Sequence, residues 1–193
     1  MKKQGTYTVT TSLSDNDLIR TFLRTQDSAY FSQLYRKYAQ KVYGKCISLL
    51  KEQQLAEDAM QDIFTKVFLN LSSFNEKSQF STWIYSVTYN YCIDLIRKGK
   101  KSKGLFVDDI ERTADVIDDI EDAFLMEMEV KRLKVILEKI PVDDHAILLM
   151  KYQDDMSIRD IAEGLQKTES AVKMKLKRAK EKAAEVYHTL YKD

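Results

Sequence analysis

Residues 56–98 read AEDAMQDIFTKVFLNLSSFNEKSQFSTWIYSVTYNYCIDLIRK, and this stretch decides the fold. Its apolar residues recur at three- and four-residue steps up to Leu71 and again from Ile84, which predicts two amphipathic helices. The predicted helices cover residues 55–71 and 82–98, and the polar residues 72–79 between them have no period and predict a loop. The apolar face of each helix must be buried in a core.

Two further helices are predicted upstream of this stretch. Ser14 and Asp17 have the spacing of a capping box, which marks a helix start. Asp27 is a second cap, and the apolar residues after it continue at helical spacing as far as Tyr43. Gly99 follows the helix predicted over 82–98, and we expect it to end that helix in a left-handed conformation.

Composition supports a helical protein throughout. The chain has 193 residues, of which 44% are hydrophobic, and contains only five glycines and one proline. The net charge is +1, but the charges lie in blocks, with ten acidic residues and a single arginine between 106 and 129. We therefore predict an all-α chain with two small helical domains at 14–99 and 123–191, joined by an acidic linker at 100–122. That linker is either a solubilising tether or a segment that imitates nucleic acid in a basic channel of a partner.

The second domain is predicted to contain a helix-turn-helix. Residues 157–180 read SIRDIAEGLQKTESAVKMKLKRAK, in which Ser157 and Asp160 form a capping box for a short helix and a tight turn precedes a long one. If Val172 is buried, the outer side of the long helix carries short polar, thioether and cationic side chains suited to a DNA major groove. These residues are Thr168, Ser170, Lys173, Met174, Lys177 and Arg178.

The first domain carries two further candidate surfaces. Asp58, Gln61 and Asp62 lie opposite the apolar face of their helix and form an acidic and amide stripe, which is either a solvated face or a docking surface. Aromatic and basic side chains beside a loop are typical of a single-stranded nucleic-acid site. This second set comprises Phe74, Asn75, Lys77, Ser78, Phe80, Thr82, Trp83, Asn90, Arg97 and Lys98.

Other classes of protein are poorly supported. Cys46 and Cys92 lie far apart in apolar helical patterns, which indicates two buried thiols and no disulfide framework. The two histidines have no neighbouring ligand cluster, so no metal site is predicted, and no catalytic residue or cofactor is predicted either. No run of residues is apolar enough to span a membrane, so we expect a cytoplasmic protein without membrane insertion.

The ordered motifs make the chain resemble the extracytoplasmic-function (ECF) class of bacterial RNA polymerase sigma factors, in the sigma-70 superfamily. The resemblance extends from residue 15 to residue 187. It rests on Ala56-Glu57-Asp58 with Gln61 and Asp62, on Phe80-Ser81-Thr82-Trp83-Ile84 with Asn90, Asp94 and Arg97, and on Ser157, Ile161-Ala162-Glu163, Leu165 and Val172-Lys173.

The resemblance implies a function for each surface. The acidic stripe would dock on core RNA polymerase, and the loop 74–80 with the start of the next helix would capture an extruded base of the promoter's minus-ten element. Asn90, Arg97 and Lys98 would hold the neighbouring backbone, while the outer face of residues 168–182 would read the minus-thirty-five element. An anti-sigma factor is a further implied partner.

The sequence departs from the usual pattern of that class in three places. Asn75-Glu76 stands where a basic residue and a glycine are common, and Gln166 stands where the turn of the second domain usually has glycine. We expect this turn to be reshaped around Gly164. Lys175 replaces the usual arginine, which predicts a weaker phosphate contact.

The alternative interpretation is a stand-alone helix-turn-helix transcriptional regulator. Such a protein would bind its duplex site without polymerase, as a dimer in the usual case. It would leave the acidic stripe and the aromatic loop of the first domain without a clear use.

Overall fold

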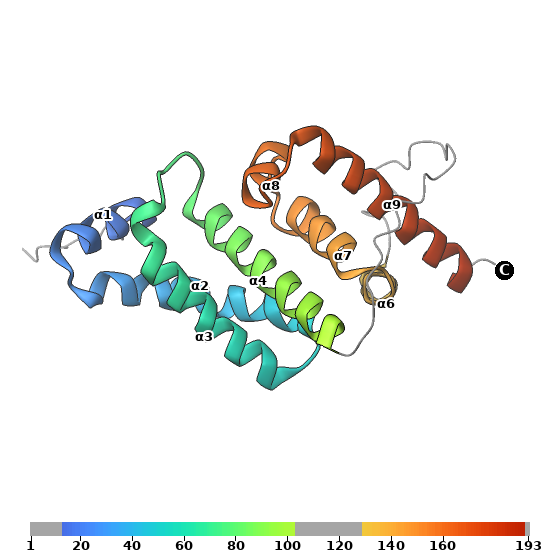
Figure 1. Ribbon diagram of the computed structural model, residues 1–193, viewed down its shortest axis with the longest axis horizontal. Helices are drawn as coiled ribbons and strands as arrows, with labels where there is room; N and C mark the ends of the chain where they lie inside the picture. Colours follow the sequence, from blue (N-terminus) through green and yellow to red (C-terminus); the bar gives the residue numbers. More distant parts are fainter. Residues whose placement is uncertain (1–12, 103–128, 192–193) are drawn as a thin grey trace, which may run out of the picture.

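The computed structural model describes residues 13–102 and 129–191, which form helices joined by short loops, with no β-strand among them (Figure 1). The all-α prediction is therefore confirmed. The first group of helices is α1 (Asp15–Thr25), α2 (Ser28–Leu50), α3 (Gln53–Asn70), η1 (Leu71–Ser73) and α4 (Phe80–Ser102). The second group is α6 (Val130–Lys139), α7 (Val142–Leu148), η2 (Leu149–Gln153), α8 (Ile158–Gly164) and α9 (Glu169–Tyr191).

The predicted caps begin the helices as expected. Ser14 accepts a hydrogen bond from the backbone N–H of Asp17 at 3.2 Å, and Asp27 accepts one from Ala29 at 2.9 Å. Ser157 and Asp160 form both bonds of the capping box at the start of α8. Each cap satisfies backbone donors that a helix start otherwise leaves free.

Each group of helices has its own apolar centre. In the first domain the fully buried side chains include Val42, Ile63 and Ile84, one from each of α2, α3 and α4. In the second domain Ile136, Met150, Ile161, Val172 and Ala179 are all fully buried and come from α6, η2, α8 and α9. Ile84 and Val172, two positions that the spacing placed on buried faces, therefore lie in the cores.

Helix α4 is longer than the sequence indicated. It begins at Phe80, two residues before the predicted start at Thr82, and continues through Gly99 to Ser102. The prediction that Gly99 ends the helix was wrong. A single glycine costs an exposed helix only about 1 kcal/mol, which the neighbouring good helix formers Lys98 and Lys100 outweigh.

The two domains pack against each other along α4, which contacts α7 and α8, while α2 also contacts α7 (Figure 1). Lys45 of α2 donates to Asp154, just after η2, with 2.5 Å between Nζ and Oδ1. Both side chains are only 5% exposed. The hydroxyl of Tyr89 donates to the other oxygen of Asp154 at 2.7 Å. A fully paired carboxylate is thus buried between the domains.

This contact changes which side of α4 is buried. Counted from Ile84 at three- and four-residue steps, the apolar side predicted for this helix runs through Val87, Tyr91 and Leu95, but those three residues are only half-buried. Tyr85 and Tyr89 are buried instead, although the same spacing leaves Tyr85 off the apolar side and predicts that it is exposed. The helix is covered on two sides because the second domain packs on the face that the pattern left free.

Cys46 and Cys92 are both buried, as expected, yet they are neighbours in space. The Sγ atoms lie 3.8 Å apart, where α2 packs on α4, and both thiols are free. The hydrogen bond with Cys46, and burial after it, raise the pKa of the Cys92 thiol. The pair therefore acts as two small apolar side chains in the core.

His145 of α7 gives the fold a dependence on pH. The side chain is 4% exposed, and burial, with a smaller contribution from Lys51 that Glu138 opposes, lowers its pKa to about 4. In the unfolded chain the pKa is about 6.5, so protons favour unfolding below that pH. Between pH 6.5 and 5 we expect a loss of about 2 kcal/mol of unfolding free energy. Denaturant unfolding at both pH values should show this loss of unfolding free energy in the wild type and in His188→Gln, and a smaller loss in His145→Gln. An equal loss in His145→Gln would contradict the assignment.

Candidate functional site

The acidic stripe on α3 is exposed, as the sequence predicted. Asp58, Gln61 and Asp62 all lie on the surface, and Asp58 accepts a hydrogen bond from Gln54 one turn earlier at 3.1 Å. Asp62 also accepts a bond from the hydroxyl of Tyr91 on α4 at 2.5 Å. That bond fixes the position of one carboxylate of the stripe while leaving it accessible to a partner.

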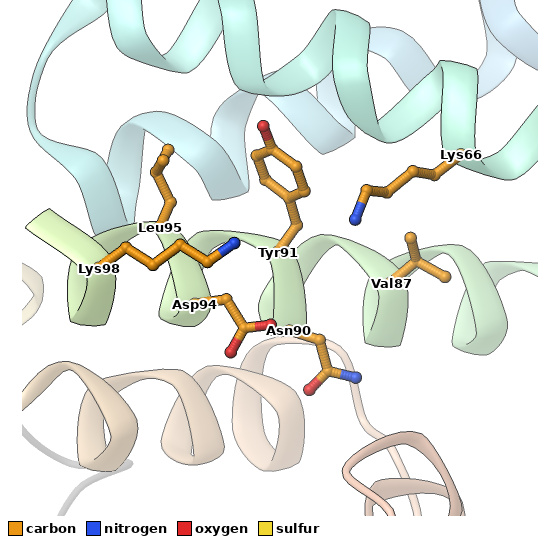
Figure 2. Close-up of a pocket in the computed structure, with 7 residues that line it drawn as sticks. All are labelled: Lys66, Val87, Asn90, Tyr91, Asp94, Leu95 and Lys98. Atoms are coloured by element: carbon orange, nitrogen blue, oxygen red, sulfur yellow. The ribbon is translucent and has the colours of Figure 1, made fainter.

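A pocket of about 260 Å³ lies beside the stripe, between α3 and α4 (Figure 2). Lys66 and Lys98 extend toward Tyr91 from its two sides, and the Lys66 ammonium lies 5.1 Å from the ring centre. An ammonium within about 6 Å of an aromatic ring is attracted to it. The surface thus changes from acidic at Asp62 to basic within one helix turn.

The loop between η1 and α4 packs over a cluster of three aromatic side chains. Phe74 and Phe80 are buried, with ring centres 5.6 Å apart, and Trp83 lies 5.6 and 5.8 Å from them. Asn75, Lys77 and Gln79 are exposed above this aromatic cluster, while Ser78 and Thr82 are half-buried. The loop therefore presents polar side chains outward and keeps its two phenylalanines in the core.

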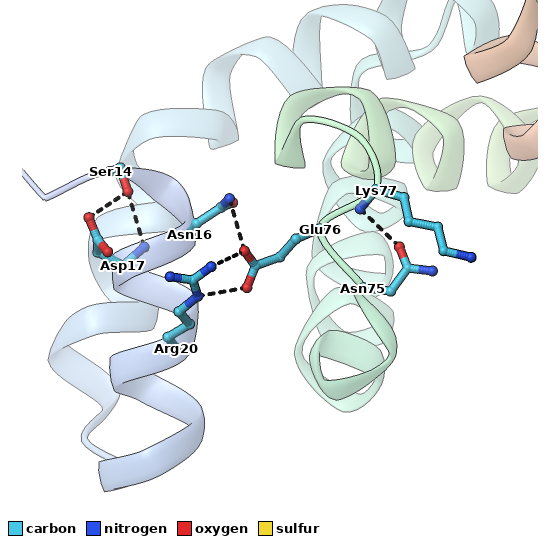
Figure 3. A network of polar contacts seen from close by, with 7 residues as sticks. All are labelled: Ser14, Asn16, Asp17, Arg20, Asn75, Glu76 and Lys77. Atoms are coloured by element: carbon cyan, nitrogen blue, oxygen red, sulfur yellow. Dashed lines mark hydrogen bonds and ion pairs between the residues drawn. The ribbon is translucent and has the colours of Figure 1, made fainter.

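Glu76 ties this loop to α1. It takes a left-handed conformation with φ of 58°, and its carboxylate accepts bonds from Arg20 and from Asn16 at 3.2 Å (Figure 3). The hydrogen bond from Arg20 lowers the pKa of Glu76. Glu76 stands where glycine is common in the class that the chain resembles, and it takes the backbone conformation that glycine favours. Its side-chain hydrogen bonds offset the strain of that backbone conformation.

Asn90 and Arg97, predicted to hold a DNA backbone, face the second domain. The Asn90 side chain donates to the carbonyl of Gly164 at 2.7 Å, and Arg97 forms an ion pair with Asp143 at 2.5 Å. Lys98 is exposed and lies instead on the side of α4 that carries Tyr91. The first two residues are therefore engaged by α7 and α8 in this conformation.

The helix-turn-helix is formed by α8 and α9. Thr168 caps α9 by accepting from Ala171 at 3.2 Å, and Ser170, Lys173 and Met174 are exposed. Lys177 and Arg178 are half-buried on the same helix. The structure thus brings the predicted outer residues together along one side of α9, the side away from the buried Val172.

The turn between α8 and α9 differs from our expectation. Gln166 itself takes the left-handed conformation, with φ of 53°, so the turn is not reshaped around Gly164. Gly164 instead lies against α4, where a Cβ atom would come within 2.2 Å of the Ser86 hydroxyl. The glycine is needed for a close contact between domains.

Lys175 points inward and belongs to an ion-pair network that the sequence did not indicate. Asp144 of α7 is fully buried, with Lys175 Nζ 2.6 Å from Oδ1 and Lys182 Nζ 2.6 Å from Oδ2. The Lys182 contact is a hydrogen bond, whereas Oδ1 has no well-directed donor and is held by charge. The prediction of a weaker phosphate contact at Lys175 loses its basis because this lysine faces the core.

Two features are absent from residues 13–102 and 129–191. Within them no group of three or more His, Cys, Asp or Glu side chains could hold a metal ion. Nor is any helix there long and apolar enough to cross a membrane.

Two family models match the chain, one for each domain. The Sigma-70 region 2 model matches residues 34–102, and the Sigma-70, region 4 model matches residues 131–182. The ECF RNA polymerase sigma factor SigW of Bacillus subtilis is 29% identical over 163 residues, covering 80% of this chain and 87% of that protein. The ECF sigma factor SigM of Mycobacterium tuberculosis is 25% identical over 171 residues, covering 89% and 83%.

The chain belongs to the ECF class of sigma-70 family sigma factors. As a sigma factor it binds core RNA polymerase and directs it to promoters for transcription initiation.

Solved structures share this fold. CnrH, solved in complex with the cytosolic domain of CnrY, superposes with a TM-score of 0.63 at 18% identity, covering 91% of this sigma factor and 98% of CnrH. RpoE of Bartonella quintana, solved with the anti-sigma factor NepR, gives 0.58 at 20% identity, covering 81% and 95%. At such identities the likeness concerns the fold alone.

Proposed function

We propose that this sigma factor divides promoter recognition among three surfaces. The acidic stripe docks on polymerase. The loop over the aromatic cluster, together with α4, binds the minus-ten element, and the outer face of α9 reads the minus-thirty-five element. The proposed domains are residues 14–99 and 123–191, with the intervening 100–122 as a linker, most of which lies outside the described residues. The observation that carries the proposal is the set of exposed polar side chains along one side of α9, backed by a fully buried opposite side.

The polymerase surface is proposed from its exposure and chemistry. Asp58, Gln61 and Asp62 present carboxylates and an amide on a rigid helix, and Tyr91 holds Asp62 in position. Such a stripe complements a basic helical surface, and charge complementarity of this kind raises association rate and specificity. The proposed partner surface is therefore a basic helical part of core polymerase.

The minus-ten surface is proposed from the loop and its neighbours. Asn75, Lys77 and Ser78 would contact the extruded base, and Thr82 and Trp83 would line the start of α4 beneath it. Phe74 and Phe80 would support the loop from the core, since both are buried. Asn90, Arg97 and Lys98 would hold the backbone. Extruding a base costs a few kcal/mol, which these contacts must offset.

An anti-sigma factor is a further proposed partner. The chain shares its fold with RpoE of Bartonella quintana, which was solved bound to the anti-sigma factor NepR. A protein of that class would compete for the surfaces that polymerase and promoter use.

The α9 assignment can be tested with Lys173→Ala combined with Arg178→Ala. We expect weaker binding to duplex carrying the minus-thirty-five element and unchanged binding to polymerase. Losing two phosphate contacts should reduce the slope of log affinity against log salt by about 1.8. Fluorescence anisotropy over a salt series measures the slope, and Lys131→Ala with Lys134→Ala, both exposed on α6, is the charge-matched control. If the control had the same effect, or if polymerase binding fell instead, α9 would not be the reading helix.

A further inference from the structure

We propose that Lys66 binds an acidic side chain of core RNA polymerase, so that the polymerase surface facing α3 carries an acid as well as bases. This inference rests on the proposed docking of the acidic stripe. It adds a residue of opposite charge to that interface, and it states the order in which the partner's charges must lie.

Lys66 continues the line of the stripe along α3. Asp58, Asp62 and Lys66 follow one another at four-residue steps, which places them on one side of the helix at intervals of about 6 Å. All three side chains are exposed. A partner that covers this side of α3 therefore meets two carboxylates and then an ammonium.

The Lys66 ammonium is oriented but has no counter-ion. It lies 5.1 Å from the ring centre of Tyr91, and among residues 13–102 and 129–191 no carboxylate lies within ion-pair distance of it. The Tyr91 hydroxyl donates to Asp62, so a single aromatic side chain orients one charge of each sign. An ammonium held in this way is available to an acidic partner.

The pocket beside Lys66 gives an acidic side chain room to enter. Its volume is about 260 Å³, and Figure 2 shows Lys66 and Lys98 extending toward Tyr91 from its two sides. An ion pair formed in such a recess is screened by solvent less than one on an open surface. Lys98 lies on the α4 side, where the promoter backbone is proposed to pass, so the proposal concerns Lys66 alone.

The surrounding charges favour a protein partner over a nucleic acid. Asp94 also lines the pocket, and Asp62 is bonded to Tyr91, another lining residue. A DNA strand in the pocket would bring successive phosphates toward these carboxylates, which repel them. A protein surface can place one acid opposite Lys66 and basic side chains opposite Asp58 and Asp62. If that surface is a helix, its acid lies three or four residues from a base.

The sign of one substitution tests the proposal. If the polymerase surface were only basic, Lys66 would repel it, and removing the ammonium would strengthen binding. If the surface carries an acid opposite Lys66, the same change weakens binding. Lys66→Met removes the charge and keeps most of the apolar stem, so the direction of the change in affinity decides between the two.

Surface plasmon resonance with core polymerase, without DNA, measures this affinity. We expect Lys66→Met to weaken binding about fivefold. Lys66→Glu should weaken it at least about 30-fold, because it places like charges against each other. Lys66→Arg keeps the charge and should bind as the wild type does. Lys131→Met and Lys131→Glu make the same charge changes at an exposed site of α6 and should leave the affinity unchanged. Circular dichroism should show equal helicity in all variants.

Charge reversal in the polymerase identifies the partner acid. A library of core polymerases, each with one surface Asp or Glu changed to Lys, is screened for binding to Lys66→Glu. We expect one substitution to restore binding by at least about tenfold and to weaken binding of the wild-type sigma factor. A substitution that merely disturbed α3 would not be repaired by a change in the polymerase, so this reciprocal pattern reports direct pairing.

The outcomes distinguish this inference from the docking function. Unchanged or tighter binding by Lys66→Met would overturn the acidic partner, even where Asp58→Arg with Asp62→Arg abolishes binding and so supports the stripe. Wild-type affinity in that stripe variant would instead refute the docking surface itself. Normal core binding by Lys66→Glu, with weaker binding of its holoenzyme to promoter fragments, would assign Lys66 to a DNA phosphate and overturn the proposal. Failure of every polymerase substitution to rescue Lys66→Glu would also overturn it.

Discussion

Arginine at both Asp58 and Asp62 is expected to abolish binding to core RNA polymerase. Both carboxylates are exposed on α3, on the side away from its buried face, so the change reverses the stripe without touching the core. Placing like charges against a basic partner costs several kcal/mol, and we expect affinity to fall by at least about 100-fold. Co-purification and surface plasmon resonance with core polymerase measure the loss.

The controls separate charge from folding and from the Tyr91 bond. Glu163→Arg with Glu185→Arg makes the same change in net charge at two exposed sites of the second domain and should bind polymerase normally. Tyr91→Phe removes only the hydroxyl bonded to Asp62 and should have a small effect. Wild-type affinity in the Asp58 and Asp62 double variant, or equal loss in the charge control, would refute the docking surface.

Methionine at both Lys175 and Lys182 is expected to lower the unfolding free energy of the second domain by about 3–5 kcal/mol. The change leaves the Asp144 carboxylate buried without either of its cations, and an uncompensated buried charge has a cost of this size. The methionines retain the long apolar stems, so packing is largely kept. Helix α9, whose placement depends on this carboxylate, should loosen with the domain.

The single tryptophan makes this measurement specific to one domain. Trp83 lies in the first domain, so its fluorescence follows that domain while circular dichroism at 222 nm follows both. We expect an early transition in helicity that fluorescence does not show. Adding Asp144→Leu should restore much of the stability, because no buried charge then remains. Lys131→Met with Lys134→Met, both exposed on α6, is the matched control. A single late transition in the Lys175 and Lys182 variant would contradict the assignment.

Local chemistry explains what the sequence could predict. The caps at Ser14, Asp27 and Ser157 depend on residues at most three positions apart, and the helices depend on apolar spacing within one segment. These features need no knowledge of the rest of the chain. The stripe on α3 and the outer face of α9 followed from the same spacing, because the side opposite a buried face is exposed when nothing else covers it.

Contacts between distant segments explain the rest. Lys45 and Asp154 are 109 positions apart, and nothing near either residue indicates that they meet. The second domain covers one side of α4. That buried side could not be predicted from the spacing of apolar residues within α4 itself. Likewise Lys175 was taken for a DNA-facing residue, although its partner Asp144 lies on another helix. Gly164 was assigned a conformational role, whereas its function is to permit the approach of Ser86.

The most direct test of the divided promoter recognition is transcription in vitro with core polymerase on a library of genomic promoter fragments, followed by sequencing of transcript starts. We expect transcript starts that share two motifs at a fixed spacing upstream of the start. In Lys173→Ala with Arg178→Ala, only the motif farther from the start, the minus-thirty-five element, should lose its influence on transcription. Duplex binding by the folded protein, without stimulation of an active core enzyme, would contradict this expectation and point to a stand-alone regulator.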